Sequence, residues 1–399
     1  MSFLHVSSMT LSCAAGRGLT EVRSALEQAR SGLRSNDFPD CSLKTWIGRV
    51  DGVEDVNLQD QSGDGLDDYN CRNNRLALLG LEQDGFVASV DRLKQRYRPE
   101  RIACVIGTST AGIGSTETAY RELGAPGPDG RERFASQYLL PRVHTPHTSS
   151  AFTARVLGLK GPIITVSTAC SSSAKVFASA ARLIAGGLAD AAVVGGVDSL
   201  CLSVLYGFHS LELVSEKPCR PFDRARNGLS LGEAAGFAIV EKAPEQSIGR
   251  ILGWGESSDA HHMASPHPEG AGASAAMSKA LSSAGLDASE VGYINCHGTA
   301  TPMNDAVEAR AIRQVFASPP PAASTKGWTG HTLGAAGITE AVFSLLALAD
   351  GRLPAGLNLD DPEDDFILMA PRTQRVDVVL SNSFGFGGSN CSLVLGSDR

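Results

Sequence analysis

Hydrophobic and polar positions follow two different periods along the chain, and the clearest example lies between residues 161 and 200. A short apolar run at 163–166 is followed by a small-residue segment with helical spacing, 171–184, and then by a second apolar run, 191–195. Short continuous apolar runs bounded by turn residues are typical of buried parallel strands. The pattern therefore predicts a strand–helix–strand unit and an α/β fold.

Further elements are expected on both sides of this unit. In the N-terminal part, the pattern predicts two helices, at 19–33 and 71–90, with a loop at 34–70 between them. It also predicts a strand at 101–107 and a turn at 124–131. In the C-terminal part, it predicts a strand at 291–296 and two helices, at 305–316 and 336–349. A final pair of strands, at 376–380 and 391–395, is expected on either side of a glycine-rich turn.

The two parts of the chain contain a weak internal sequence repeat. Ser167-Thr168 and Ser324-Thr325 each precede a small-residue helix start, an alanine-rich helix and a glycine. Duplicated halves predict such a repeat, although an alanine- and glycine-rich composition produces it as well. We expect a connection near 242–246, which divides the chain into an N-terminal half, 1–244, and a C-terminal half, 245–399.

Composition narrows the class of protein. Of the 399 residues, 42% are hydrophobic and 20% are charged, as in a globular enzyme with a large core. The net charge of −8 argues against nucleic acid or an anionic membrane as the main partner. The nine cysteines contain no Cys-x-x-Cys pair, which favours a reducing cytoplasm over a disulfide framework or a zinc ribbon. No apolar run is expected to reach transmembrane length.

Cys170 is the first candidate for chemistry. It lies where the apolar run 163–166 gives way to the helix that begins at Ser171. The free N–H groups and positive dipole end of that helix favour a thiolate, which is the reactive form of cysteine. A buried structural cysteine is equally compatible with this position alone.

Three later segments carry polar groups that complement a thiolate. His297 follows a buried strand, and the carboxyl end of a parallel strand is where α/β proteins bind ligands. Lys326 and His331 lie in a glycine-rich stretch, and the turn at 381–390 has backbone amides that can hold an oxyanion. A strand-end histidine, a helix cap and a solvated lysine explain each residue singly, but together they favour catalysis.

Four motifs in this order resemble the elongating β-ketoacyl-acyl-carrier-protein synthases. They are Thr-Ala-Cys-Ser-Ser-Ser at 168–173, His-Gly-Thr-Ala-Thr-Pro at 297–302, Lys…Gly-His-Thr-Leu-Gly-Ala-Ala-Gly at 326–337 and Asn-Ser-Phe-Gly-Phe-Gly-Gly-Ser-Asn at 382–390. The resemblance is specific over about 160–399 and weak over 1–100.

The resemblance implies a thiolase-like fold, with two pseudo-symmetric halves in a layered αβαβα arrangement. It also implies a decarboxylative Claisen condensation, in which Cys170 accepts an acyl group and a malonyl group then supplies the attacking carbanion. No cofactor or metal is implied, because both substrates arrive on the phosphopantetheine of acyl carrier protein. The expected assembly is a homodimer, or a heterodimer with a ketosynthase-like partner.

The same resemblance assigns roles to individual residues. His297 and His331 are expected to stabilise the enolate, and Lys326 to orient His331. The backbone N–H groups of Cys170 and Phe386 form the expected oxyanion hole, and the Phe386 side chain gates the acyl pocket.

Supporting roles follow for residues near these motifs. Glu308 is expected to act as the counter-ion of Asp305, and Glu340 to support the same network. Thr299 and Thr301 are expected to hydrogen-bond the pantetheine arm.

Two other groups of residues are weighed and set aside. The histidines His261, His262 and His267 suggest a metal site, but two prolines and no cysteine accompany them, and the segment resembles the loop beside the family's active site. Arg72 and Arg75 could dock the acidic carrier protein, although a solvated helix face explains them better.

Competing functions remain open. A non-condensing, chain-length-factor-like partner subunit is disfavoured because Cys170, both histidines and Lys326 are present. A thiolase would need a second cysteine, for which Cys391 is the candidate.

The pathway is a separate question. Fatty acid synthesis and a specialised polyene or polyketide pathway both remain, with a slight preference for the specialised pathway. Residues 105–150 are expected to line the acyl pocket and to decide chain length.

Overall fold

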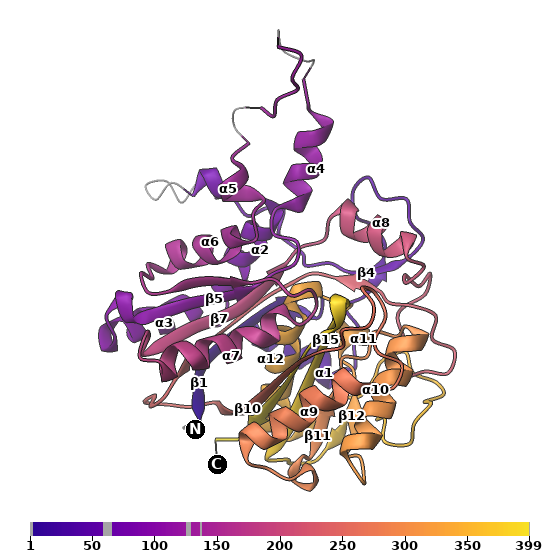
Figure 1. The fold of residues 1–399 in the computed structure, drawn as a ribbon. Coiled ribbons are helices and arrows are strands. Elements are labelled where there is room, and N and C mark those ends of the chain that lie inside the picture. The colour runs from indigo at the N-terminus through magenta and orange to yellow at the C-terminus, as the bar shows by residue number, and fades with distance from the viewer. Residues whose placement is uncertain (1–2, 59–65, 125–128, 136–137, 399) are drawn as a thin grey trace.

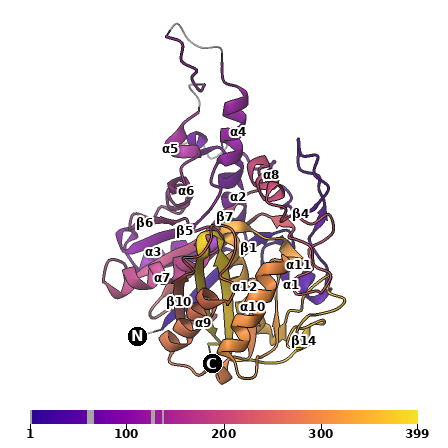
Figure 2. The same cartoon turned by 45° about the vertical axis from the view of Figure 1, so that its right-hand side comes forward.

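A computed structural model describes residues 3–58, 66–124, 129–135 and 138–398. Parts of the loop expected at 34–70 and of the turn expected at 124–131 lie outside these ranges. The structure is built around one mixed sheet with helices on both faces and between its halves (Figures 1 and 2).

The sheet has ten strands in line, and the same strand order runs outward in both directions from its centre, where β1 pairs with β10. One direction contains β1 (Leu4–Cys13), β9 (Ala234–Glu241), β7 (Ala191–Asp198), β5 (Ile102–Gly107) and β6 (Ile163–Val166), with β2 (Gly16–Arg17) paired to β1. The other contains β10 (Gly249–Ser258), β16 (Ser389–Gly396), β15 (Val378–Gly385), β11 (Tyr293–Asn295) and β12 (Ala322–Ala323).

Going outward from the centre, the strands of each half are the first, fifth, fourth, second and third of that half in chain order. The structure therefore has two pseudo-symmetric halves, as expected. The connection between the two sets runs from the end of β9 at Glu241 to the start of β10 at Gly249. The predicted boundary at residues 244 and 245 falls inside it.

Three hydrophobic clusters define five layers. The first outer layer, α2 (Arg72–Leu81), α3 (Phe86–Arg96) and α6 (His147–Leu157), packs on the N-terminal strands. The central layer, α7 (Ser172–Ala185) and α12 (Ala336–Asp350), packs between the two sets of strands. The second outer layer, α9 (Ala271–Ala284) and α10 (Pro302–Val315), covers the C-terminal strands. The arrangement is the predicted αβαβα fold.

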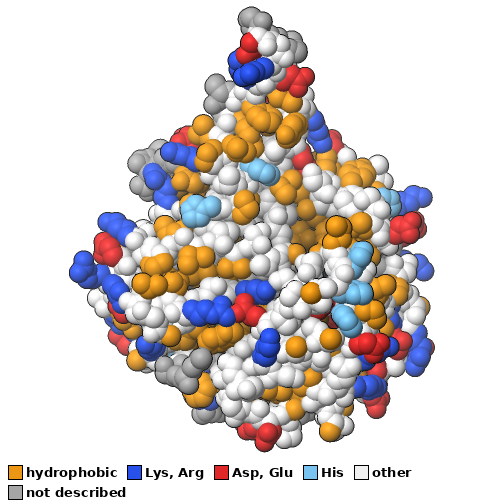
Figure 3. Space-filling model, viewed as in Figure 1, with side chains coloured by type: hydrophobic (Ala, Val, Ile, Leu, Met, Phe, Trp, Pro, Cys, Tyr) orange, Lys and Arg blue, Asp and Glu red, His pale blue; other side chains and the backbone are white. Residues whose placement is uncertain are grey.

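The remaining elements are short or lie at the periphery. They are α1 (Leu19–Glu27), α4 (Ile113–Arg121), α5 (Leu140–Val143), α8 (Leu202–Ser210), α11 (Lys326–Thr329), β3 (Arg34–Ser35), β4 (Trp46–Gly48), β8 (Leu231–Gly232), β13 (Arg352–Leu353) and β14 (Arg372–Thr373). Helix α4 and the segment that follows it project from the body, and apolar side chains are exposed there (Figure 3).

Two helix predictions are wrong in detail. The helix predicted at 19–33 ends at Glu27, where Ala29 takes a positive φ of 49°. The helix predicted at 71–90 is two helices, because Asp84 and Gly85 have φ of 55° and 65° and turn the chain between them. The Asp84 carboxylate accepts the N–H of Leu19 there, a long-range contact that local periodicity does not encode.

One helical stretch, Leu333–Asp350, is long and apolar enough to cross a membrane by length and composition, contrary to the expectation from sequence. It is 89% buried inside the protein, and most of it is the central helix α12. Burial on this scale is typical of a core helix.

The two central helices meet at a glycine, which makes a stability prediction possible. A Cβ at Gly337 would lie 2.2 Å from the backbone nitrogen of Ala174 on α7. We expect Gly337→Ala to lower the free energy of unfolding by about 2 kcal/mol, because two backbones must separate to admit the methyl group. Urea unfolding followed by circular dichroism measures the loss.

Gly207→Ala on α8 is the matched control. A Cβ at Gly207 meets no described atom within 4 Å, so this substitution is expected to leave stability unchanged or to raise it by about 0.5 kcal/mol. Equal losses in both variants would contradict the close helix contact.

Candidate active site

The nucleophile candidate lies on a strained turn. Strand β6 ends at Val166 and α7 begins at Ser172, with Ala169 at a positive φ of 52° between them. Cys170 follows this residue directly and is 5% exposed. A non-glycine residue with positive φ costs energy and persists only where the surroundings hold it, which is common at functional sites.

His297 is held by its backbone. It follows β11, and the Glu308 carboxylate accepts the N–H groups of His297 and Gly298 at 2.8 and 2.7 Å. The Asp305 carboxylate accepts the N–H groups of Ala300 and Phe222 at 3.1 and 2.7 Å. Glu308 is therefore not the counter-ion of Asp305, since both are carboxylates that anchor separate backbone segments.

Lys326 contacts His297 rather than His331, which corrects the role expected from sequence. Its Nζ lies 3.3 Å from His297 Nδ1 and also donates to the His297 carbonyl oxygen and to Glu340. An ammonium group can only donate, so His297 Nδ1 accepts and the ring proton is on Nε2. Glu340 pairs with Lys326 and accepts the Ser383 hydroxyl at 3.3 Å, in line with its predicted supporting role.

His331 contacts the sulfur. Its Nε2 lies 3.0 Å from Cys170 Sγ, and its ring meets that of His297 edge to face, with centroids 5.3 Å apart. Among the described residues, His331 Nδ1 has no hydrogen-bonding partner, so nothing fixes which of its nitrogens carries the proton. Burial and the charge of Lys326 lower the pKa of both imidazoles well below the usual value. Both rings are therefore neutral.

The thiol is protonated at rest. Burial raises the pKa of Cys170 to about 12, although Lys326 and the Phe386 N–H lower it. The helix dipole expected to yield a thiolate is thus outweighed by desolvation. Proton transfer to His331 must accompany attack by the sulfur.

This resting state predicts the pH dependence of alkylation. Since the pKa of Cys170 is about 12, its thiolate fraction should rise about tenfold per pH unit at neutral and mildly alkaline pH. The second-order rate constant for Cys170 and iodoacetamide, followed by peptide mass spectrometry, should therefore increase without a plateau up to about pH 9.5. A plateau near pH 7 would show a resting thiolate instead.

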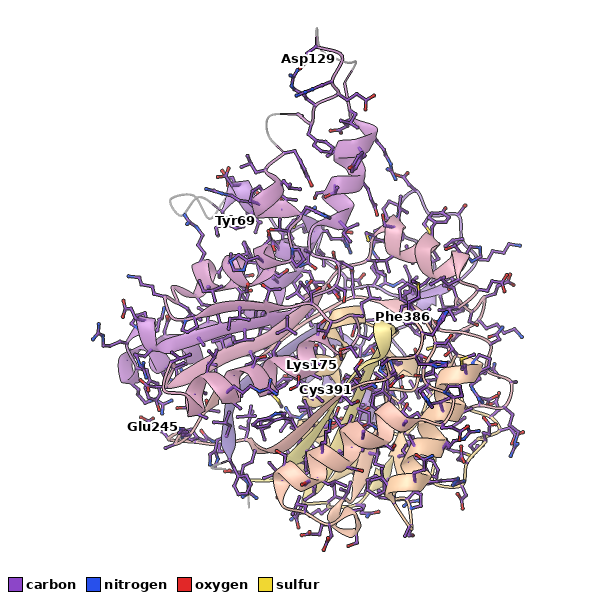
Figure 4. The ribbon with its side chains drawn as sticks, viewed as in Figure 1. Tyr69, Asp129, Lys175, Glu245, Phe386 and Cys391 are labelled. Carbon is purple, nitrogen blue, oxygen red and sulfur yellow. The ribbon has the colours of Figure 1, made fainter. Side chains whose placement is uncertain are left out.

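Phe386 lies at the end of β15, in the turn that leads to β16 (Figure 4). Its N–H points at the Cys170 sulfur, and its ring stacks on Phe208 of α8 with centroids 5.4 Å apart. Gly387 has a φ of 75°, and its N–H donates to the Met263 carbonyl at 2.7 Å. The oxyanion hole made of the Cys170 and Phe386 amides stays a prediction.

These groups surround a cavity of about 320 Å³. Its lining includes Cys170, His297, His331, Thr299, Thr301, Phe208, Leu213, Leu229, Phe384, Phe386, Met303, Asn304 and residues 264–266. The hydroxyls of Thr299 and Thr301 lie 2.9 Å apart. The cavity thus joins the nucleophile, two neutral imidazoles and a largely apolar wall.

Asp198 is a buried residue that sequence analysis missed. Its carboxylate accepts the N–H groups of Ser109 and Thr110 at 2.9 Å and that of Gly334 at 2.5 Å. It thereby ties the end of β5 to the segment that carries His331. An acid ending the otherwise apolar strand β7 was the available signal.

Three residues considered from sequence lie elsewhere. Arg72 is mostly buried and pairs with the buried Glu233, so it is part of the internal structure and not a docking residue. Arg75 is also partly buried, on the same helix. Cys391 is fully buried within β16 and does not line the cavity, which leaves the thiolase hypothesis without its second cysteine.

Comparison with known proteins gives consistent results. Residues 81–246 match the family described as "Beta-ketoacyl synthase, N-terminal domain", and residues 248–360 match its C-terminal domain. The chain is 38% identical over 315 residues to 3-oxoacyl-[acyl-carrier-protein] synthase 2 of Coxiella burnetii, covering 74% of this chain and 75% of the relative. The corresponding protein of Vibrio cholerae is 35% identical over 316 residues, with coverage of 74% and 75%.

Two solved structures are similar over nearly the whole chain. One is the ketosynthase ApeO in complex with its chain length factor ApeC from Xenorhabdus doucetiae, at 37% identity, a TM-score of 0.85 and coverage of 99% and 98%. The other is a β-ketoacyl synthase from Burkholderia phymatum, at 27% identity, a TM-score of 0.86 and complete coverage of both chains.

Proposed function

Because the chain belongs to the β-ketoacyl synthase family and is a condensing enzyme of the acyltransferase class, we propose a specific role for each residue around the cavity. The reaction joins an acyl group held on Cys170 to malonyl-acyl carrier protein and gives β-ketoacyl-acyl carrier protein. Both substrates are carried on phosphopantetheine, and no cofactor takes part. The thioester arm enters past Thr299 and Thr301, which hydrogen-bond it.

The first step transfers the acyl group. Cys170 Sγ attacks the thioester carbonyl carbon as its proton passes to His331 Nε2, 3.0 Å away. The N–H groups of Cys170 and Phe386 receive the charge on the oxygen. The carbon–sulfur bond to pantetheine then breaks, and the departing sulfur takes the proton from His331.

The second step forms the carbon–carbon bond. Malonyl thioester loses CO2, and the resulting enolate oxygen accepts the Nε2–H of His297. His331 donates from its side of the cavity after exchange with solvent has moved its single ring proton from Nδ1 to Nε2, which the first step left free. The enolate carbon attacks the acyl carbon, and the bond to Cys170 breaks. The released sulfur takes one proton from solvent, which balances the reaction.

The observation that supports this proposal best is the placement of His331 Nε2 at 3.0 Å from Cys170 Sγ, beside a second neutral imidazole. Purified protein incubated with malonyl-acyl carrier protein and acyl carrier proteins bearing graded chain lengths should give β-ketoacyl products by mass spectrometry. If neither product nor acylated Cys170 is formed, the result favours the non-condensing partner subunit instead.

We further propose that the chain dimerises with a ketosynthase-like subunit. Strand β6 is the edge of the sheet, and its Ile163 is 36% exposed. Tyr120 on α4 and Leu140 on α5 are 61% and 48% exposed. An apolar sheet edge beside an apolar surface is typical of an interface. Native mass spectrometry of the chain, alone and with a co-expressed partner, distinguishes a homodimer from a heterodimer.

A specialised polyene or polyketide pathway is our preferred context. The ketosynthase ApeO, solved in complex with its chain length factor, is 37% identical and similar over 99% of the chain, which supports this context. All nine cysteines are free, which fits a cytoplasmic protein. The graded acyl chains used above also test the proposed acyl pocket at 105–150.

A further inference from the structure

We propose that Cys170, His297 and His331 also bind Zn²⁺, and that bound zinc inhibits the enzyme; the inhibition, but not the binding, rests on the proposed function. The sulfur and one nitrogen from each ring all lie within 4.8 Å of one another, and all three side chains are buried. Within the described ranges, this is the one group of three histidine, cysteine or acidic side chains placed closely enough to hold a single ion.

The spacing suits tetrahedral zinc. Zn–S and Zn–N bonds of about 2.3 and 2.0 Å place a sulfur and a nitrogen ligand about 3.6 Å apart. His331 Nε2 is 3.0 Å from Cys170 Sγ, so this pair must open by only about half an ångström. The third ligand, which lies within 4.8 Å of the other two, must close by at most about 1.5 Å to reach tetrahedral spacing.

The fourth coordination position faces the cavity. Cys170, His297 and His331 all line the 320 Å³ space through which a thioester must enter, so a hydrated ion can reach them and retain a water molecule. Three protein ligands and one water are typical of an accessible zinc site rather than a purely structural one. An ion in this position occupies the place of the reacting carbonyl group.

The charges around the site set the strength of binding. Coordination replaces the Cys170 proton, which leaves to solvent, so that Zn²⁺ and a thiolate carry one net positive charge. Lys326 lies against His297, so its charge opposes a cation at the site, and its ion pair with Glu340 offsets that charge only in part. Zinc at His297 Nε2 requires a proton on Nδ1 facing Lys326, which opposes binding. We therefore expect reversible rather than permanent occupancy.

The protein has a second place where an added metal ion could bind, a cluster of histidines on its surface. His261 and His267 have ring centroids 5.1 Å apart near the cavity mouth, where His262 is also exposed. This cluster contains no thiol, so a bound metal there gives no thiolate spectrum. That difference separates the two sites experimentally.

Co²⁺, followed by Zn²⁺ in competition, tests the proposal on the purified full chain. Tetrahedral Co²⁺ bound to a thiolate gives an intense near-ultraviolet charge-transfer band, which wild type and the double variant His261→Asn/His267→Asn should both show. Cys170→Ser should lose the band, and His331→Ala should weaken Zn²⁺ binding by about 100-fold. Zinc should also slow iodoacetamide labelling of Cys170, with recovery on adding EDTA.

A charge-transfer band that survives in Cys170→Ser, or that disappears in the double histidine variant, overturns the assignment. Near-ultraviolet circular dichroism of each variant confirms that it is folded. Condensation assays with and without Zn²⁺ test the inhibition separately. If metal-free wild type forms no product, the proposed function fails, whereas the absorption band still decides the metal site.

Discussion

Replacing Cys170 by alanine is expected to lower the rate of acyl transfer by about four orders of magnitude or more, because no other thiol lines the described cavity and Cys170 is the residue in contact with His331. Decarboxylation of malonyl-acyl carrier protein should continue. The groups that stabilise the enolate, His297 and its partner Lys326, keep their contacts when the sulfur is removed. Radiolabelled acyl transfer and CO2 release measure the two steps separately.

The matched control for this variant is Cys391→Ala. Cys391 is also a fully buried cysteine, but it lies in β16 away from the cavity lining. It should retain acyl transfer. A labelled acyl-enzyme formed by Cys170→Ala would remove Cys170 from the mechanism, and loss of transfer in the control would implicate a second thiol.

Lys326→Met is expected to affect both activity and stability. Without the ammonium group, the proton of His297 is no longer held on Nε2, and enolate stabilisation should weaken, lowering decarboxylation by about 10²- to 10³-fold. The Glu340 carboxylate, 2% exposed, loses its charged partner. Breaking a buried ion pair in this way costs about 3–5 kcal/mol.

The double variant Lys326→Met/Glu340→Gln separates these effects. Removing both charges should restore most of the free energy of unfolding, measured in urea, because no uncompensated charge remains buried. CO2 release should stay low, since His297 still lacks its donor. Full activity in Lys326→Met would show that Lys326 has only a structural role.

The sequence could predict that the catalytic side chains lie close together, because two of them follow the ends of parallel strands. Cys170 and His297 each follow a parallel strand closely, and such strands place their carboxyl ends at one edge of the sheet. His331 is predicted from its glycine-rich segment and from the family motif at 326–337, not from a strand end. Hydrophobic periodicity located the central strands and helices for the same reason, since their burial is nearly complete.

Other features could not be predicted because they depend on contacts between distant segments. Lys326 lies five residues before His331 in the chain, yet its short helix directs the ammonium group to His297. Asp198 is satisfied by backbone N–H groups from two loops, and no local pattern indicates such donors. The pKa of Cys170 likewise depends on burial, which outweighs the adjacent helix end.

The glycine contact between α7 and α12 has a mechanical consequence. Cys170 lies two residues before α7, and His331 lies five residues before α12, so the crossing point helps to set the distance between sulfur and imidazole. Close-packed interiors deform little, so the two halves cannot slide past each other to admit a substrate without separating the reacting pair. The predicted gate at Phe386 lies outside this contact, in the turn at 385–388, where Gly387 has a φ of 75°. We therefore expect a substrate to enter by a change in this turn, while the packed helices keep the two reacting atoms at a fixed separation.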